Sequence, residues 1–351
     1  MPGPAGPGRN LDPRWTRGVP AARRSPVMIL AGDVGGTSAR LALAQVQSGV
    51  VTFLRRQDYT SAEYPGLAPI VCEFIRGLDE VPSRACFGVP CPVTDGRCQV
   101  ANLNWTIDLA SLREETGLPG ATLINDFAAI AHAIPMLGPA DTFQLKPGQA
   151  VPGAPIAILG AGTGLGQGAL LPHGSELTVV GSEGGHADFA PRTAEEIRFL
   201  EFLLTRLTRV SWERILSGPG IENLYRFLRE TRYAPEQPEV AAELAAQDPP
   251  SVITRHALAG SDALSARALD MFAAAYGAQA GNLALVYRAL GGVYLAGGIA
   301  PRILPILTRG GFHEAFASKG RLSQLLLDIP VHVITHPSVG LIGAAAVAAQ
   351  A

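Results

Sequence analysis

From residue 27 to residue 44 the sequence reads VMILAGDVGGTSARLALA, and from residue 156 to residue 171 it reads IAILGAGTGLGQGALL. Each stretch is an apolar run, a glycine-rich turn and a second apolar run, which is the pattern of two strands joined by a tight turn. Glycine suits such turns because it takes positive φ at little cost. Backbone N–H groups in such a turn can bind phosphate oxygens, so the two turns predict two sides of one polyphosphate site.

Length and charge narrow the possible classes of protein. The chain has 351 residues, enough for two domains, with 47% hydrophobic and 17% charged residues. A net charge of -2 argues against nucleic acid or an anionic membrane as partner. No apolar run approaches the ~18 residues that span a bilayer. The four cysteines have no metal-site spacing, and we expect a cytoplasmic protein with reduced thiols.

Residues 1–26 differ from the rest of the chain. They hold five Arg against one Asp, with six Pro, four Gly and no apolar periodicity. This composition predicts a disordered tail outside the fold, or upstream sequence before a start at Met28. A transit peptide is the alternative, but the prolines oppose an amphipathic helix.

The apolar periodicity predicts a mixed α/β chain in two parts. In the first part we expect strands at 27–31, 39–46, 50–58, 85–89, 98–101 and 121–124, and helices near 67–75, 108–115 and 126–134. In the second part we expect strands at 156–159, 166–171, 176–180, 293–296 and 329–334, helices at 193–208, 261–290 and 339–349, and a surface excursion at 234–251. The repeated strand–turn–strand theme favours two similar domains around a cleft.

The sequence around the glycine turns excludes one class of nucleotide-binding protein and disfavours another. The only lysines are Lys146 and Lys319, and neither follows the GxxxxG loop that a P-loop protein needs. A dinucleotide fingerprint is disfavoured because Leu165 replaces its third glycine and a strand follows the turn. What remains is a hairpin that binds phosphates with the help of Mg²⁺, which Asp33 could hold through water. The alternative is that these glycines only make hairpin turns.

Three further segments carry polar groups suited to a polyhydroxylated ligand. Asn125 and Asp126 end an apolar strand and open a helix, where a carboxylate is favoured, although an ordinary helix cap would look the same. Glu183 and His186 flank two glycines, a turn that can bring an acceptor and a donor to one side. Glu213 could be another acceptor, or only a partner of its neighbour Arg214.

Taken together, these motifs resemble the bacterial glucokinase family of the hexokinase–actin–heat-shock ATPase superfamily. The resemblance rests on GDVGGT (32–37), LINDF (123–127), GAGTGLG (160–166), EGGH (183–186), ERILSGPG (213–220) and AGGI (296–299). It implies two ribonuclease-H-like α/β domains flanking a deep cleft, with sugar at the base and ATP along one wall. We expect a small domain of residues 27–136 plus 328–351 and a large domain of residues 137–327.

The resemblance also implies an activity and a role for each motif. The family transfers the γ-phosphate of ATP to the 6-hydroxyl of glucose at the entry to glycolysis, and Asp126 would be the catalytic base. The sugar ligands would be Asn125, Asp126, Glu183, His186 and Glu213. The nucleotide site would comprise Gly32, Asp33, Val34, Gly35, Gly36, Thr37, Gly162, Thr163, Gly164, Gly297 and Gly298. Mg²⁺ would be held mainly through the phosphates.

The family further implies a homodimer, for which the alanine-rich segment 257–289 offers a candidate interface. One departure is Ser38, which stands where the family usually has Asn, and we expect adjusted phosphate contacts there.

The nearest rival is a kinase of another hexose or an N-acetylhexosamine. A sugar-sensing regulator of the same fold would need a helix-turn-helix in front, and an actin-like filament protein or a polyphosphate phosphatase would not need the sugar ligands.

Overall fold

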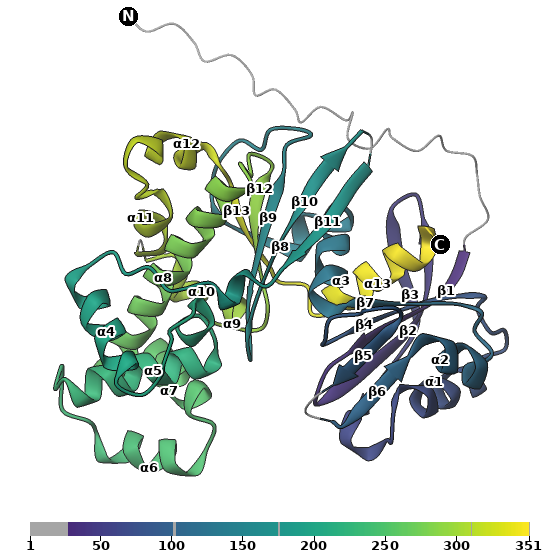
Figure 1. Cartoon of the computed structure of the whole chain (residues 1–351), viewed down its shortest axis with the longest axis horizontal. Coiled ribbons are helices and arrows are strands. Elements are labelled where there is room, and N and C mark those ends of the chain that lie inside the picture. The colour runs from purple at the N-terminus through teal and green to yellow at the C-terminus, as the bar shows by residue number, and fades with distance from the viewer. Residues whose placement is uncertain (1–26, 101–102, 175, 310, 351) are drawn as a thin grey trace, which may run out of the picture.

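Two mixed β-sheets, one from each half of the chain, organise the fold (Figure 1). The structure is a computed structural model, and it describes residues 27–350 except 101–102, 175 and 310. The tail predicted for residues 1–26 lies outside the described residues. Elsewhere the order of strands and helices confirms the mixed α/β class.

The first sheet has five strands in the order β3-β2-β1-β4-β7. They are β1 (Val27–Val34), β2 (Ser38–Gln47), β3 (Val50–Thr60), β4 (Arg84–Val89) and β7 (Gly120–Asn125). The first three are joined as antiparallel hairpins, whereas β1, β4 and β7 run parallel. The residues that follow β1 and β7 therefore meet at one edge of the sheet. A ribbon of β5 (Arg97–Val100) and β6 (Trp105–Asp108) and the turn η2 (Ser61–Glu63) complete this half.

Alternate side chains of β1 pack on opposite faces of this sheet. Leu30 joins a core that includes α1 (Leu67–Arg76) and α2 (Leu109–Thr116). On the other face Ile29 packs with α13 (Val339–Gln350), the last helix of the chain. Both faces of the first sheet are thus covered by helices.

The small residues of α13 let its backbone approach α3 (Asp126–Ala133) closely. A side chain at Gly343 would overlap the carbonyl oxygen of Ala129 on α3. Because α13 also packs on β1 and β4, it holds α3 against the first sheet.

The second sheet has six strands in the order β11-β10-β9-β12-β13-β8. They are β8 (Thr142–Lys146), β9 (Ile156–Ala161), β10 (Leu165–His173), β11 (Glu176–Ser182), β12 (Gly292–Ala296) and β13 (Val331–Ile334). β9, β12 and β13 run parallel. β10 and β8 are antiparallel to them, and β11 pairs antiparallel with β10, so it runs in the same direction as β9.

Helices pack beside the second sheet, most of them in the excursion between β11 and β12 (Figure 1). They are α4 (Ala194–Leu204), α5 (Gly218–Glu230), α6 (Pro238–Ala246), α7 (Pro249–Ala259), α8 (Ala263–Val286), α9 (Ile299–Arg302), α10 (Leu304–Leu307), α11 (Gly311–Ala317) and α12 (Ser323–Asp328), with short 3-10 turns η3 (Ile134–Met136), η4 (Pro139–Asp141), η5 (Gly184–His186), η6 (Trp212–Arg214) and η7 (Gly320–Leu322). Within the described part of the chain, none of the helices combines the length and apolarity that a bilayer crossing requires.

The alanine-rich segment expected as a dimer interface is instead the core of its own half. α8 runs through this half with Leu269, Phe272 and Tyr276 fully buried, and most of its alanines are buried as well. Small side chains allow neighbouring elements to approach α8: a side chain at Gly277 would overlap the carbonyl oxygen of Phe312 on α11. The helix therefore has little surface left to offer a second copy.

The surface excursion expected at 234–251 contains helix α6 and the start of α7. Prolines occupy the first turn of both helices, at Pro238 and at Pro249. Proline is compatible with that position because the first N–H groups of a helix have no intrahelical partner. These prolines of the predicted surface excursion therefore begin helices.

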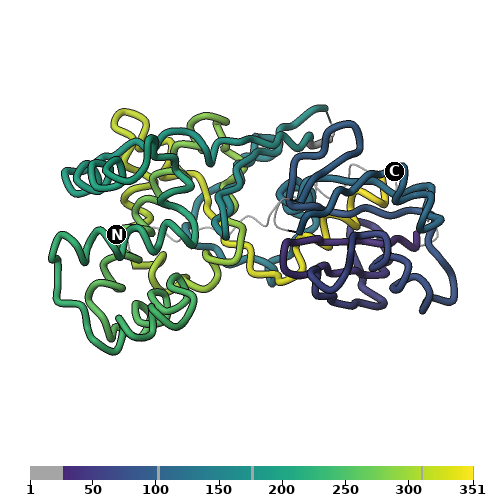
Figure 2. Tube along the Cα trace, turned by 60° about the horizontal axis from the view of Figure 1, so that its bottom comes forward, coloured from purple at the N-terminus to yellow at the C-terminus, as the bar shows by residue number. Residues whose placement is uncertain are grey.

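The chain crosses twice between the two halves, which form two lobes (Figure 2). The expected division placed residues 328–351 with the first lobe, but β13 pairs with β12 and β8 in the second sheet. Only α13, after the second crossing, packs on the first sheet. The two crossings are joined because the carbonyl of Asp141 accepts bonds from the N–H groups of Thr335 (2.9 Å) and His336 (3.2 Å).

Cys91 and Cys98 form a disulfide, with Cα atoms 5.8 Å apart. The expectation that all four thiols are reduced is therefore wrong for this pair. Cys91 follows β4 and Cys98 lies on β5, so the fold of the β5–β6 ribbon brings them together across seven residues. Cys72 and Cys86 are free in the described residues.

Candidate active site

Asp126 lies where β7 ends and α3 begins. Asn125 is the cap of this helix, because its Oδ1 accepts bonds from the N–H groups of Phe127 (3.0 Å) and Ala128 (3.3 Å). Asp126 also accepts a bond from Phe127 N–H (2.7 Å). Burial raises the pKa of Asp126 to about 6, and the charge of Asp33 adds to this rise while the bond from Phe127 opposes it. The carboxylate is thus a stronger base than usual and still ionised at neutral pH.

The capping geometry limits what Asn125 can offer a ligand. An asparagine side chain carries both a donor and an acceptor, but here both lone-pair positions of Oδ1 serve the helix. Nδ2 makes a long bond of 3.4 Å to the carbonyl of Cys91. Asn125 can therefore offer a ligand only its amide donor.

Asp33 lies at the same edge of the first sheet as Asp126. In the strand register Asp33 is opposite Gly88, and Gly88 is opposite Ile124, two residues before Asp126. Gly88 keeps the region between them free of a side chain, since a Cβ there would lie 3.5 Å from the Asp126 Cα. The two carboxylates are close enough to interact electrostatically.

Asp33 is half-buried, and opposing influences act on its charge. Burial raises its pKa, and the charges of Arg40 and Arg56 oppose that rise. Arg40 Nη1 lies 3.5 Å from Asp33 Oδ2. The first turn of α13 also adjoins the carboxylate, because a Cβ on Gly340 would lie 2.8 Å from Asp33 Cγ. A helix N-terminus stabilises an anion at such a place.

Ser61 stabilises the first glycine turn through two hydrogen bonds. The sequence analysis did not single this residue out. Gly35 N–H donates to Ser38 O (2.8 Å), and Ser61 Oγ–H donates to Gly35 O (2.9 Å). The N–H of Ser61 donates to Thr37 O (3.0 Å). The tip of the turn, Gly36 and Thr37, is exposed. These bonds fix the turn and leave its tip open to a ligand.

The predicted reason for the glycines is wrong in both turns. The glycines that take positive φ include Gly297 (+81°), but not those of the two turns. Close approach explains several of them instead: a side chain on Gly32 would overlap the ring of Phe87, and a Cβ on Gly160 would lie 2.6 Å from the ring of Phe127. Gly32 and Gly160, in the strands that lead into the two turns, therefore need to be glycine because a side chain would not fit.

The second turn adjoins Gly297 and Gly298 at one edge of the second sheet. β9 and β12 are parallel neighbours with Gly160 opposite Ala296, so the residues that follow both strands meet. Gly297 contacts the carbonyl of Ala161, whereas a Cβ on Gly162 or Gly298 would meet nothing within 4 Å. The edge therefore has open space beside two glycine backbones.

Glu183, His186 and Glu213 gather where β10 begins. Glu213 Oε2 accepts a bond from Leu165 N–H (3.1 Å), and η5, which ends at His186, contacts η6, which holds Glu213. Trp212 N–H bonds to Ala187 O (2.9 Å) and joins the two turns. Glu183 and His186 are exposed. We call residues 183–186 the sugar loop below.

Phe127 brings the two groups of predicted residues together, and the sequence analysis missed it. The residue follows Asp126, and its ring covers three glycines of the second sheet. A Cβ would lie 2.6 Å from this ring on Gly160, 2.5 Å on Gly166 and 3.6 Å on Gly168. The start of α3 is thus seated on β9 and β10, beside the sugar loop. The sequence held only an indirect sign of this contact. It was an aromatic residue directly after Asn125-Asp126, together with three glycines in the segments that form β9 and β10.

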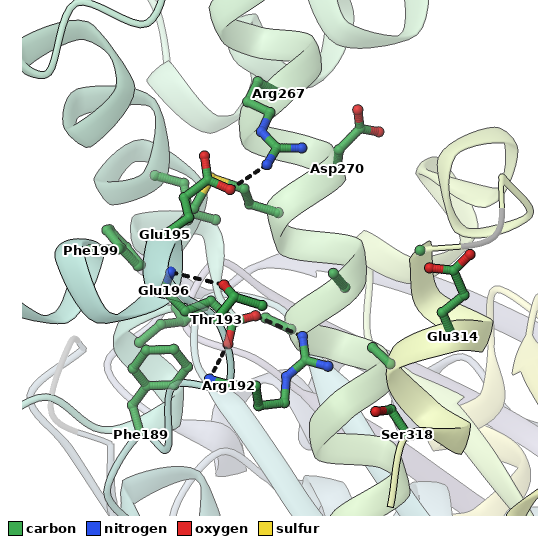
Figure 3. A pocket seen from close by; sticks show the side chains of 17 residues that line it. Phe189, Arg192, Thr193, Glu195, Glu196, Phe199, Arg267, Asp270, Glu314 and Ser318 are labelled. Carbon is green, nitrogen blue, oxygen red and sulfur yellow. Dashed lines mark hydrogen bonds and ion pairs between the residues drawn. The ribbon is translucent and has the colours of Figure 1, made fainter. Parts of the chain in front are cut away.

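A separate cavity of about 300 Å³ lies between α4, α8 and α11 (Figure 3). Its arginines are paired, Arg192 with Glu196 at 2.7 Å and Arg267 with Glu195. None of the predicted site residues lines it. Within the described residues there is also no group of three or more potential metal ligands.

The glucokinase family model matches residues 30–351. The chain belongs to the glucokinase family. A glucokinase of Nostoc sp. (strain PCC 7120 / SAG 25.82 / UTEX 2576) is 44% identical over 339 residues, covering 92% of this chain and 99% of the relative. A solved glucokinase from an Antarctic psychrotroph is 32% identical, with a TM-score of 0.82 and coverage of 92% of this chain and 99% of that one. The predicted family and class of enzyme, a hexose kinase, are confirmed.

A more distant structure shares the fold alone. The ROK family glucokinase from Streptomyces griseus, solved in complex with glucose and AMPPNP, has 21% sequence identity, a TM-score of 0.62 and coverage of 92% of this chain and 100% of that one. The two-lobed actin-like fold predicted from the motifs is confirmed.

Proposed function

We propose that this glucokinase-family enzyme transfers the γ-phosphoryl group of ATP to the 6-hydroxyl of glucose, with Asp126 as the base. The environment of Asp126 carries the proposal: a half-buried carboxylate with a raised pKa, at the edge that also holds Asp33. In phosphoryl transfer the base mainly orients the attacking hydroxyl and accepts its proton. A pKa of about 6 suits both tasks at neutral pH.

The sugar would bind between Asp126 and the sugar loop. Glu183 and Glu213 supply acceptors for sugar hydroxyls, and His186 and the Asn125 amide supply donors. The contact of Phe127 with the second sheet supports this sugar position, because the contact brings the start of α3 next to the sugar loop. Glucose in the Streptomyces griseus structure of the same fold is consistent with it.

The nucleotide would bind along the two glycine turns. Gly36 and Thr37 offer an exposed turn on one side, and the open edge at Gly162 and Gly298 offers backbone groups and space on the other. The AMPPNP in the Streptomyces griseus structure supports ATP as the donor. A polyphosphate donor would need the phosphate turns and not the space beside Gly298.

Asp33 is the carboxylate suited to a magnesium ion. Mg²⁺ prefers oxygen ligands and keeps several waters, so one carboxylate together with substrate phosphates is a sufficient donor set. When bound, the ion neutralises charge on the phosphates that are transferred and released. Asp33 would hold it, directly or through water, and the helix N-terminus beside it favours the charged form of the carboxylate.

Closure of the two lobes would exclude water from the reacting groups. Residues 137–338 would then move as one body against residues 27–136 and α13, around the paired crossings at Asp141 and Thr335. Exclusion is needed because water could attack ATP in place of the sugar hydroxyl.

We further propose that the enzyme is a homodimer located in the cytoplasm. Size-exclusion chromatography with light scattering would test the homodimer, and cell fractionation would test the location.

A coupled assay of ADP release tests the function. We expect rapid release with ATP and glucose, and much slower release with mannose, fructose or N-acetylglucosamine. Asp126→Ala should lose phosphorylation by several orders of magnitude and still bind glucose in a calorimetric titration. Preferred turnover of N-acetylglucosamine would favour the rival hexosamine kinase, and full turnover by Asp126→Ala would remove Asp126 from its role.

A further inference from the structure

Four polar side chains form a continuous hydrogen-bonded row behind the sugar loop. Lys319 Nζ donates to Asn282 Oδ1 (2.6 Å), and Asn282 Nδ2 donates to Gln279 Oε1 (2.9 Å). Gln279 Nε2 then donates to Gln167 Oε1 (3.3 Å). Gln279 and Gln167 are 5% and 2% exposed, so the row ends in the core.

The ammonium group of Lys319 fixes the direction of every bond in the row. An ammonium group only donates, so Asn282 must present its oxygen to Lys319 and its nitrogen to Gln279. The same reasoning passes along the row, and Gln279 must present its nitrogen to Gln167. Gln167 therefore accepts with its oxygen and has its own Nε2 donors left over.

The Nε2 group of Gln167 is buried and has no partner among the residues that the structure describes. Buried polar groups in native proteins are nearly always hydrogen-bonded, so an unpaired buried donor needs an explanation. The Oε1 acceptor of Gln167 serves Gln279, but neither the row nor packing accounts for the Nε2 donor. The amide therefore has a use that packing alone does not supply.

Gln167 lies directly beneath the sugar loop. On β10 it is opposite Ser182, the residue before Glu183. A Cβ on Gly184 would lie 2.5 Å from Gln167 Oε1, so Gly184 packs directly against the side-chain amide of Gln167. Ser182 Oγ accepts a bond from Gly184 N–H (2.9 Å) on the same side of the loop. Glu183 is adjacent to both supports.

We propose that Gln167 is a positioning residue for sugar binding, and that Gln279 acts through it. Gln167 supports Gly184, and when sugar binds, its remaining Nε2–H donates to a main-chain carbonyl of the sugar loop. This bond fixes the loop and thus the directions of Glu183 and His186. The inference rests on the proposed sugar site, and it adds a residue that does not touch the sugar.

Steady-state kinetics of three variants test the inference. Gln167→Met keeps the length of the side chain and removes the donor, and we expect the KM for glucose to rise about tenfold. The kcat and the KM for ATP should change less than about twofold, because the loss is one of sugar binding. Gln279→Met should raise the KM for glucose less, and it should have no further effect when added to Gln167→Met.

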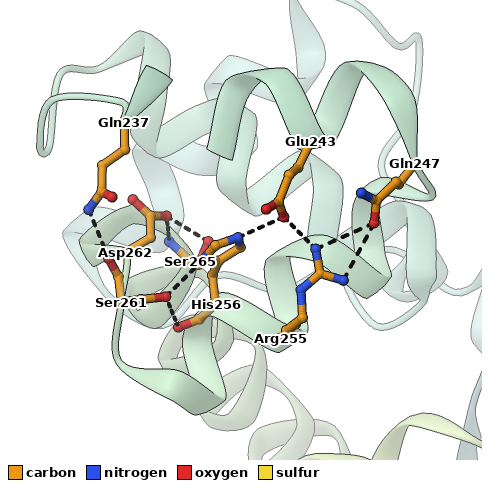
Figure 4. Close-up of polar contacts among 8 residues, drawn as sticks. All are labelled: Gln237, Glu243, Gln247, Arg255, His256, Ser261, Asp262 and Ser265. Carbon is orange, nitrogen blue, oxygen red and sulfur yellow. Dashed lines mark hydrogen bonds and ion pairs between the residues drawn. The ribbon is translucent and has the colours of Figure 1, made fainter. Parts of the chain in front are cut away.

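Ser265→Ala is the matched control on the same helix as Gln279. Ser265 is fully buried and donates to Asp262 Oδ2 (2.6 Å) at the start of α8, away from the sugar loop (Figure 4). This variant should lower the thermal midpoint and leave the KM for glucose unchanged. An unchanged KM in a folded Gln167→Met, or an equal rise in Ser265→Ala, would overturn the inference.

Two further outcomes keep the test decisive. If Gln167→Met does not fold, Gln279→Met decides alone, and an unchanged KM for glucose in that variant overturns the inference. If the unaltered enzyme prefers another sugar, the proposed function fails separately, and the same KM comparison is made with the preferred sugar.

Discussion

Asp126 is half-buried beside a second carboxylate. Desolvation, and to a smaller extent the charge of Asp33, raises its pKa to about 6. Below that pH the carboxyl is protonated and cannot accept the proton of the sugar hydroxyl. We expect kcat/KM for glucose to fall about tenfold per pH unit below pH 6 and to be level from pH 7 to pH 8. A pH–rate profile at constant ionic strength measures this, and a level profile down to pH 5 would contradict the assigned base.

The same carboxylate should lower the stability of the folded enzyme at neutral pH. A raised pKa means that the folded state favours the protonated form, so the stabilisation is present below pH 4 and is lost as pH rises through 6. Asp126→Asn removes the buried charge and keeps an oxygen for Phe127 N–H. We expect the free energy of unfolding in urea to rise by about 1–2 kcal/mol at pH 7.5 and by little at pH 4.5. A loss of stability at pH 7.5 would show that burial of Asp126 is not costly.

Chemically distinctive residues could be predicted from the sequence, and supporting residues could not. Asp126, Glu183 and Glu213 stand in short motifs whose chemistry is readable without a structure. Gln167 and Ser61 have ordinary neighbours in sequence, and their partners lie 112 and 26 residues away. A hydrogen bond across such a distance leaves no local pattern, so only the fold reveals it.

At the scale of elements, Phe127 joins helix α3 to the second sheet through contacts with Gly160, Gly166 and Gly168. Phe127→Ala should lower kcat about 10- to 100-fold, because Asp126 would lose its fixed position against the sugar. The free energy of unfolding should also fall by about 2–3 kcal/mol. Phe143→Ala is the control, since Phe143 on β8 is 42% exposed and should tolerate the change. Equal kcat in both variants would contradict a role for Phe127 in placing the base.

Elements defined by local pattern were predicted better than their pairing. The hairpins β1–β2 and β9–β10 follow from alternating apolar residues around glycines. β13 was assigned to the wrong sheet, because a short apolar strand does not indicate its neighbours and four helices, α9 to α12, separate it from its partner β12. The prolines at 238 and 249 can begin a helix as well as interrupt one, so only the structure distinguishes the two.

At the scale of the whole molecule, two lobes are joined by only two crossings, and these are tied together at Asp141, Thr335 and His336. Helix α3 also packs on β10 and β11 between the lobes. The lobes can rotate about this packed helix and the two crossings, which is the geometry of hinge closure. Glucose would favour closure because its ligands come from both lobes, Asp126 from one and the sugar loop from the other. ATP alone would not engage the sugar loop.

Small-angle X-ray scattering of Asp126→Asn tests closure without turnover. This variant should bind both substrates and transfer phosphate too slowly to consume them during the measurement. We expect the radius of gyration to decrease on adding glucose, to decrease further with glucose and Mg²⁺–ATP together, and to stay constant with Mg²⁺–ATP alone. Glu183→Gln in the same background should need more glucose for the same decrease, since the loop would bind the sugar less tightly. If the radius is unchanged by saturating glucose while calorimetry shows binding, the site forms without movement of the lobes, and water must be excluded by the sugar loop itself.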